Sequence, residues 1–250
     1  MNNNPKPVLL WPEQQREALN ERDNVDENGW YHNVVIPRLF PFLPPVEKGN
    51  GGCILICPGG AYRILDWVAH VERLAARFNP LGYAVVGLKY RTAVPNTDIP
   101  EKALADLRQA LELIEEYADV WNINKQKIIG LGYSAGSNLL LNHVCTPISE
   151  NTTVNLCGVA LMCMWPNEKM DSDYTPLPDV PRAFVCTTAE DRTAPESFSR
   201  AISARMEKAG IEVTTHIYPK GDHIAFNFRE DGPEVDWTPP FMKWLEKNCK

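Results

Sequence analysis

The chain has 250 residues, of which 44% are hydrophobic and 23% are charged, and these values are ordinary for a soluble globular protein. Its formal net charge of −7 disfavours nucleic acid or an anionic membrane surface as a partner. No stretch of the sequence is long and apolar enough to cross a membrane.

The N-terminus and the cysteines bear on the cellular compartment. Residues 1–7 contain no positive segment followed by an apolar run, so no secretory signal is visible and we expect a cytoplasmic protein, or a secreted one if the sequence is a trimmed mature form. Most of the seven cysteines lie within apolar runs such as Cys53–Cys57, which indicates buried reduced thiols rather than a disulfide framework. The sequence has no C-x-x-C and no clustered histidines, so we expect no metal site.

The first fifty residues differ in pattern from the rest. They are rich in proline, and Asn33–Pro37 and Leu39–Leu43 are predicted as antiparallel edge strands. From about residue 50, short apolar runs alternate with amphipathic segments. The predicted strands are Cys53–Cys57, Tyr83–Lys89, Lys127–Leu131, Leu156–Met164, Ala183–Ala189 and Glu212–Tyr218, and the predicted helices are Trp67–Phe78, Pro100–Tyr117, Ser134–Val144, Pro195–Ala209 and Pro239–Lys247.

This alternation predicts an α/β fold with a mostly parallel sheet of about eight strands and helices on both faces. We expect residues 1–250 to form a single domain, with residues 1–50 as its edge strands and no separate cap domain. In open α/β sheets the functional site lies at the carboxyl ends of the strands. Polar residues that follow predicted strands are therefore the candidates.

Gly132–Gly136, with the sequence Gly-Tyr-Ser-Ala-Gly, lies between a predicted strand and a predicted helix. A strand, a G-x-S-x-G turn and a helix together describe a nucleophile elbow, in which Ser134 stands on a sharp turn with its hydroxyl exposed. The glycines two residues away let strand and helix pass closely. The alternative interpretation is that Ser134 is a serine in an ordinary glycine turn. A serine hydroxyl becomes a nucleophile only when a base accepts its proton, so the first interpretation also requires a base.

His223 is the candidate base, because it follows the predicted strand Glu212–Tyr218 on a loop before the last helix. The other histidines lie within predicted helices or a strand, or before the α/β region: His32, His70, His143 and His216. Of these, His70 could approach a substrate, but we expect a surface or packing role for it. His223 is the choice that fits a base at a strand end.

Asp191 is the candidate acid, because it follows the predicted strand Ala183–Ala189 and completes the order Ser, Asp, His along the chain. Its expected role is to orient the imidazole and to stabilise the imidazolium that forms. Glu190 is the rival carboxylate. Asp222 adjoins the histidine in sequence, which makes the required geometry awkward.

The segment Pro58-Gly59-Gly60-Ala61-Tyr62 directly follows the predicted strand Cys53–Cys57. Acyl transfer builds negative charge on a carbonyl oxygen, and backbone N–H groups aimed at that oxygen stabilise it strongly. Gly60 and Ala61 are the candidate donors, together with the N–H of Ala135. Such a segment by itself is commonly only a tight turn. Its place after a strand upstream of the serine favours an oxyanion hole.

These residues together resemble the α/β-hydrolase esterases. Gly132–Leu139 is similar to their G-x-S-A-G-x-N-L elbow, and Pro58–Tyr62 resembles the P-G-G-G-Y loop of a bacterial branch labelled acetyl-xylan, feruloyl or "esterase/lipase", near the hormone-sensitive-lipase-like enzymes. Further similar segments are Leu10–Pro12, Gly82–Val86, Tyr90–Arg91, Asp191–Pro195 and Gly221–His223. Two departures, Ala61 at the third glycine and Ile224-Ala225 after the histidine, affect the expected pocket but remove no catalytic atom.

The resemblance implies an α/β-hydrolase fold and a serine carboxylic-ester hydrolase that forms an acyl-enzyme on Ser134 without a metal or cofactor. The expected partner is a small-molecule or carbohydrate ester carrying an acetyl or similar short acyl group, and homo-oligomer formation stays open. Tyr62, Trp67 and Trp165 are candidate substrate contacts, with core packing as the alternative for the two tryptophans. An amide or formamide hydrolase, or a non-catalytic binding protein on the same scaffold, are the alternative functions.

Overall fold

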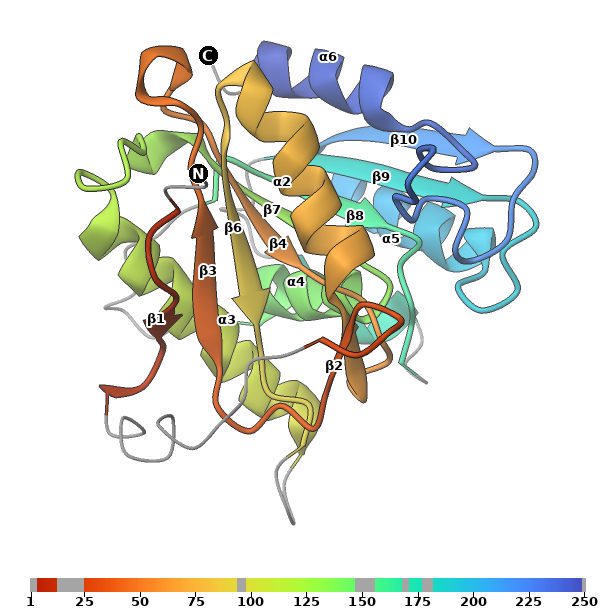
Figure 1. The fold of residues 1–250 in the computed structure, drawn as a ribbon. Helices are drawn as coiled ribbons and strands as arrows, with labels where there is room; N and C mark the ends of the chain where they lie inside the picture. The colour runs from red at the N-terminus through yellow and green to blue at the C-terminus, as the bar shows by residue number, and fades with distance from the viewer. Residues whose placement is uncertain are drawn as a thin grey trace.

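The computed structural model describes residues 4–12, 25–93, 98–146, 156–167, 171–176 and 182–248. Its centre is an eight-stranded sheet with the order β1-β3-β6-β4-β7-β8-β9-β10 (Figure 1). These strands are Val8–Leu9 (β1), Arg38–Phe42 (β3), Cys53–Cys57 (β4), Ala84–Lys89 (β6), Ile128–Tyr133 (β7), Gly158–Met162 (β8), Arg182–Thr188 (β9) and Glu212–Tyr218 (β10). Strand β3 runs opposite to β1 and β6, and every pair from β6 to β10 is parallel.

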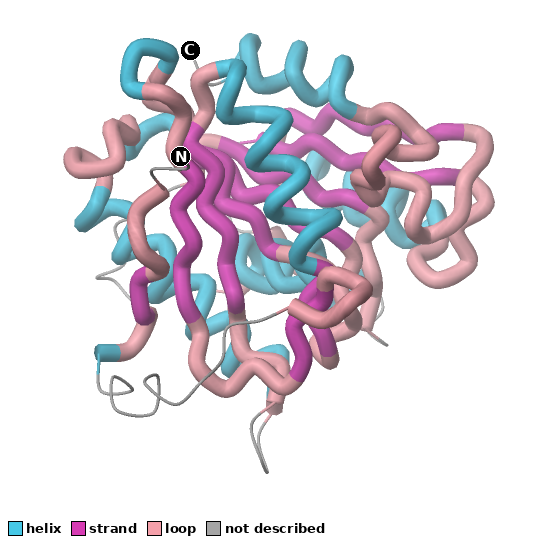
Figure 2. Tube along the Cα trace, in the orientation of Figure 1, coloured by secondary structure: helices cyan, strands magenta, loops and turns pink. Residues whose placement is uncertain are grey.

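Helices cover both faces of this sheet, as Figure 2 shows. They are Arg73–Phe78 (α2), Ile99–Tyr117 (α3), Ala135–Cys145 (α4), Glu196–Lys208 (α5) and Thr238–Asn248 (α6), with short 3-10 or π turns at Val46–Lys48 (η2), Val68–Glu72 (η3), Asn79–Leu81 (η4), Lys125–Lys127 (η5) and Asp171–Asp173 (η6). On one face, α2 and α6 meet through Phe78 and Phe241, whose ring centroids are 5.8 Å apart. On the other face, α3 packs beside α4.

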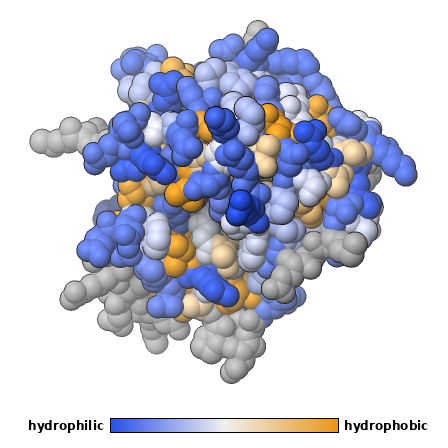
Figure 3. Space-filling model, turned by 90° about the vertical axis from the view of Figure 1, so that its right-hand side faces the viewer, coloured by the Kyte–Doolittle hydropathy of each residue, from blue (hydrophilic) through white to orange (hydrophobic). Residues whose placement is uncertain are grey.

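The central strands β4, β6, β7 and β8 are buried at every residue. Two covered faces require continuous apolar strands, which explains why these runs are apolar throughout rather than alternating. The predicted α/β fold with a mostly parallel sheet is therefore confirmed. The face of the molecule in Figure 3 is mostly hydrophilic, with hydrophobic residues in small separate areas.

The N-terminal part differs from the prediction, because Asn33–Pro37 is not a strand. Asn33 has a φ of 49°, which interrupts the extended backbone, and the edge strand begins only at Arg38. Its outer partner is β1, which the sequence analysis did not identify as a strand. A second, two-stranded sheet joins β2 (Trp30–His32) to β5 (Ile64–Asp66), so that part of the N-terminal region lies beside the turn that follows β4.

The cysteines and the helices bear on two expectations from the sequence, buried reduced thiols and the absence of a membrane-spanning segment. Among the described residues, Cys53, Cys57, Cys145, Cys163 and Cys186 have free thiols, and burial raises the pKa of the Cys53 thiol to about 12. Cys249 lies outside the described residues. Among the described residues, the helices are all too short or too polar to span a lipid bilayer.

His143 makes the stability of this fold depend on pH. It is buried in α4, and its burial, with the nearby Arg108 charge, lowers its pKa from 6.5 to about 4. As the pH falls below about 6.5, the unfolded chain therefore takes up a proton that the folded chain does not. The resulting loss of stability is complete near pH 4 and amounts to about 3 kcal/mol.

We expect His143→Gln to flatten this dependence. Urea unfolding between pH 7 and pH 4.5 should show a smaller fall in the free energy of unfolding for the variant than for the wild type. Parallel falls in the two proteins would show that the imidazole of residue 143 is not a source of the acid sensitivity.

Candidate functional site

The turn between β7 and α4 is shaped by two close backbone contacts. A Cβ at Gly136 would lie 1.9 Å from the carbonyl oxygen of Cys57, and a Cβ at Gly132 would lie 2.4 Å from that of Gly136. Only glycine fits at either position, so the first turn of α4 lies directly against the carboxyl end of β4. Ser134, at the apex, has φ 50° and ψ −113°, a strained conformation for a non-glycine residue.

The structure brings Ser134, His223 and Asp191 together in a chain of hydrogen bonds. The Ser134 hydroxyl oxygen is 2.8 Å from His223 Nε2, and His223 Nδ1 is 2.8 Å from Asp191 Oδ2. The three residues come from the ends of β7, β10 and β9, which are parallel and so end at the same edge of the sheet. This is the arrangement in which an imidazole can take a proton from a hydroxyl while a carboxylate orients the ring.

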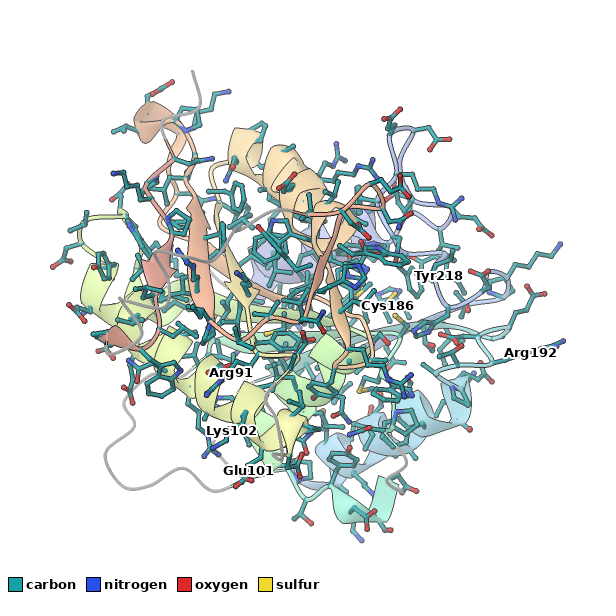
Figure 4. The ribbon with its side chains drawn as sticks, turned by 60° about the horizontal axis from the view of Figure 1, so that its bottom comes forward. Arg91, Glu101, Lys102, Cys186, Arg192 and Tyr218 are labelled. Carbon is teal, nitrogen blue, oxygen red and sulfur yellow. The ribbon has the colours of Figure 1, made fainter. Side chains whose placement is uncertain are left out.

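Asp191 is fixed by its own loop. Its Oδ1 accepts the backbone N–H groups of Thr193 at 2.9 Å and Ala194 at 2.7 Å, which leaves Oδ2 for the histidine. The carboxylate is almost fully buried. Arg192, the next residue, extends outward from the molecule in Figure 4, so its charge points away from the site.

The two rival carboxylates have other partners. Glu190 accepts the backbone N–H of Gly221 at 3.1 Å and so supports the loop before His223. Asp222 accepts the backbone N–H of Ile224 at 3.0 Å, as a short side chain commonly does in a turn. Of the three acids that the sequence offered, Asp191 is thus the one hydrogen-bonded to the histidine.

The turn after β4 faces the serine. Gly60, Ala61 and Tyr62 all have positive φ angles, of 138°, 53° and 58°. A Cβ at Gly60 would lie 2.1 Å from the carbonyl oxygen of Ile64, so this position requires glycine, whereas Ala61 has a conformation that costs strain. Within the described residues, the backbone N–H groups of Gly60, Ala61 and Ala135 have no hydrogen-bond acceptor. These N–H groups are therefore free to bind an anionic oxygen beside Ser134.

A pocket of about 530 Å³ opens at the serine, within the size range of small-molecule sites. Its mostly apolar lining comes from the turn after β4, the two-stranded sheet, η3, the elbow and the loops after β8, β9 and β10. The lining residues are Trp30, Gly59, Gly60, Ala61, Arg63, Ile64, Asp66, His70, Tyr133, Ser134, Cys163, Trp165, Thr193, His223, Ile224 and Asn227.

The predicted substrate contacts need correction at two positions. Trp67 is buried in the core, where its ring packs edge-on against Tyr31 and Phe40, and it does not line the pocket. Tyr62 also points inward, because its buried hydroxyl donates a hydrogen bond to Asn138 Oδ1 at 3.0 Å. Trp165 is half-buried and does line the pocket.

Most of the other pocket residues were not predicted as site residues, among them Trp30, Asn227 and His70. Trp30 and Asn227 gave no sequence signal, because each reaches the pocket through a loop or strand pairing that no local pattern predicts. For His70 the sequence predicts a surface or packing role. Its place in the π-helix η3, immediately after β5, turns its ring toward the pocket.

The side chains of Cys163, Asp191 and His223 form the one group in the described residues with metal-ligand chemistry, since their ligand atoms all lie within 4.8 Å. The imidazole and carboxylate atoms are already joined to each other by a hydrogen bond of 2.8 Å. Burial raises the pKa of the Cys163 thiol, so the thiol stays protonated at neutral pH. The group therefore fits a proton relay better than a metal site.

Comparison with known proteins gives one family match and two curated relatives. Residues 41–154 match the BD-FAE family model. An acetylxylan esterase of Xylanibacter ruminicola is 25% identical over 217 residues, which cover 76% of this chain and 44% of that protein. Endo-1,4-beta-xylanase B of Butyrivibrio fibrisolvens is 31% identical over 129 residues, which cover 48% of this chain and 19% of that protein. The chain thus spans less than half the length of these relatives.

Solved structures resemble the whole chain at low sequence identity. An acetyl ester-xyloside bifunctional hydrolase from Caldicellulosiruptor lactoaceticus has a TM-score of 0.73 and 22% identity, with 97% of this chain and 96% of that chain covered. MGS-M1, an α/β hydrolase enzyme from a Medee basin deep-sea metagenome library, has a TM-score of 0.72 and 23% identity, with 89% and 99% covered. The chain is therefore an α/β-hydrolase-fold protein whose residues 41–154 match the BD-FAE family.

Proposed function

We propose that this chain is a serine carboxylic-ester hydrolase that removes short acyl groups, acetyl or similar, from a carbohydrate or a small alcohol. The observation that carries the proposal is the hydrogen-bonded series Asp191, His223 and Ser134, beside a turn with free backbone N–H groups. A curated relative named as an acetylxylan esterase supports the choice of ester and acyl group.

The reaction has two steps. Ser134 Oγ attacks the ester carbonyl while His223 Nε2 accepts its proton, and Asp191 stabilises the resulting imidazolium. The alcohol then leaves with the proton from His223, and an acyl-enzyme remains on the serine. Water, activated by the same imidazole, attacks the acyl-enzyme and releases the carboxylic acid and the free serine.

The oxyanion of each tetrahedral intermediate lies beside the N–H groups of Gly60, Ala61 and Ala135. Gly60 and Ala61 line the pocket on a turn that is formed before a substrate binds, so their N–H groups would need little reorganisation when negative charge develops. The N–H of Ala135 lies in the first turn of α4, so the helix dipole adds to the stabilisation.

The pocket favours a compact substrate with an apolar face. Trp30 and Trp165 are both half-buried, and each offers a flat apolar face on which the C–H groups of a sugar ring can pack. Arg63 and Asp66 add charged hydrogen-bonding groups to this mostly apolar lining, and these groups can bind the hydroxyl groups of a sugar.

Ser134→Ala tests the nucleophile. Hydrolysis of p-nitrophenyl acetate should fall by about 10³-fold or more, because the acyl-enzyme cannot form. A fluorophosphonate probe should label the wild type and not the variant. Ser172→Ala, at an exposed serine of η6, is the matched control and should keep full activity and labelling. Unchanged hydrolysis by purified Ser134→Ala would mean that another residue is the nucleophile.

Gly60→Ala tests the turn after β4. Its Cβ would meet the carbonyl of Ile64, so the turn must shift, and kcat should fall on the order of 10²-fold as an oxyanion donor is lost. Gly210→Ala is the control, since Gly210 also has a positive φ but its Cβ would contact nothing within 4 Å. If both variants keep wild-type kcat, the turn does not bind the oxyanion.

Substrate preference is measured with p-nitrophenyl esters of increasing chain length, acetylated xylan, and matched anilides and formamides. We expect kcat/KM to be highest for acetate and to decline with chain length. Equal or faster turnover of a long-chain ester would contradict a short-acyl enzyme, and a preference for the anilide or formamide would indicate an amide hydrolase.

A further inference from the structure

The mechanism above leaves one buried histidine of the pocket without a role. His70 is 5% exposed and lies in η3, after the strand β5. Its ring stacks on Tyr133, the residue before Ser134, with the ring centroids 4.1 Å apart and the planes 2° from parallel. The stacking fixes the plane of the imidazole, and so fixes the direction of both ring nitrogens.

One of these nitrogens holds the turn after β4. His70 Nδ1 accepts the backbone N–H of Gly59 at 3.1 Å, and the carbonyl oxygen of Gly59 accepts the N–H of Asp66 at 3.0 Å. Both backbone polar groups of Gly59 are thus bound, one residue before Gly60. The site is tightly packed, because a Cβ at Gly59 would lie 2.9 Å from the carbonyl oxygen of Tyr133.

The other nitrogen contacts the loop that carries His223. His70 Nε2 is 2.9 Å from Asn227 Oδ1, and Asn227 Nδ2 donates a hydrogen bond to Asp66 Oδ2 at 2.9 Å. Since Nδ1 accepts from Gly59, the neutral ring carries its proton on Nε2 and donates it to Asn227. Asn227 lies four residues after His223 on the same loop.

We propose that His70 is a positioning residue, whose unprotonated Nδ1 holds the oxyanion-binding turn while its Nε2–H ties this turn to the His223 loop. The inference rests on the ester hydrolase proposed above and adds a residue to its machinery. Without the Nδ1 acceptor, the buried N–H of Gly59 loses its partner. The backbone of Gly60 and the strained backbone of Ala61 are then free to relax, and their N–H groups turn away from the oxyanion.

The charge state of the ring agrees with this geometry. Burial lowers the pKa of His70, and the nearby His223 acts in the same direction, whereas Asp66 and the hydrogen bond to Asn227 oppose the shift. Because burial is the largest influence, the ring is neutral at neutral pH. Nδ1 therefore keeps the lone pair that the Gly59 N–H requires.

Two amide substitutions at His70 distinguish the role of Nδ1 from the role of Nε2. Asn places its oxygen near the position of Nδ1, so His70→Asn retains an acceptor for Gly59. Gln places its amide near the position of Nε2, so His70→Gln retains the donor to Asn227 and loses the acceptor. With p-nitrophenyl acetate, we expect kcat to fall about 30-fold or more in His70→Gln with KM little changed, and to fall less than about 5-fold in His70→Asn.

The affinity of a trifluoromethyl ketone inhibitor is a second measurement, and it should not change if His70 only packs against its neighbours. Its adduct with Ser134 places an anionic oxygen where the oxyanion forms, so its affinity should fall in His70→Gln in proportion to kcat and stay near wild type in His70→Asn. The positioning role would be overturned if His70→Gln kept the wild-type kcat. It would also be overturned if kcat fell equally in both variants and in parallel with the melting temperature.

Asn227→Ala is an independent test of the link between His70 and the His223 loop, because it removes the partner of Nε2 and keeps the hydrogen bond between Nδ1 and Gly59. A moderate fall in kcat, of about 5-fold to 20-fold at unchanged KM, would support the link between the turn and the His223 loop, and an unchanged kcat would contradict it. Failure of the enzyme proposal is distinguishable, because it would appear as full activity in Ser134→Ala whatever the His70 variants do.

Discussion

The contact between the first turn of α4 and the carboxyl end of β4 is the constraint on which the site depends. Gly136 and Gly132 have no room for a side chain, because the backbone of Cys57 and of the helix itself occupies that space. This contact places the N-terminus of α4 beside the turn after β4, and it forces Ser134 into a strained conformation at the apex. Ser134 and the turn that we propose binds the oxyanion are therefore neighbours for the same steric reason.

Contacts with other elements stabilise the strained backbone of the elbow and of the turn after β4. Ser134 and Ala61 both have φ angles that non-glycine residues seldom adopt, and neither would keep them in an isolated peptide. The N–H of Ser134 donates to the carbonyl of Met162, and Gly59 is bound through both of its backbone groups. Hydrogen bonds from β8, β5 and η3 thus stabilise a backbone that local preferences oppose.

The site also couples elements that are far apart in the chain. Asp66, His70 and Asn227 join the turn after β4 to the loop of His223, across more than 150 residues of sequence. The hydrogen bonds of this network are partly buried, so each lost partner would leave a poorly hydrated polar group without a hydrogen bond. Such a network can hold the turn after β4 and the loop of His223 in one geometry before a substrate arrives.

Local sequence patterns were sufficient for the α/β fold and for the set of residues at the strand ends. Continuous apolar runs such as Cys53–Cys57 predict buried parallel strands, and parallel strands bring their carboxyl ends to one edge, so Ser134, Asp191 and His223 could be expected together. The strand predicted at Asn33–Pro37 is absent, because the positive φ of Asn33 interrupts the extended backbone there. Local patterns in the sequence do not reveal such a residue.

The tertiary structure alone decided what surrounds the three residues. Tyr62 and Trp67 follow the turn in sequence, yet the packing of their rings turns them into the core, whereas Trp30 enters the pocket through its pairing with β5. The direction of a side chain and the partner of a hydrogen bond depend on segments distant in the chain. Composition and periodicity carry only local information, so they identify which residues can do chemistry and not which of them meet the substrate.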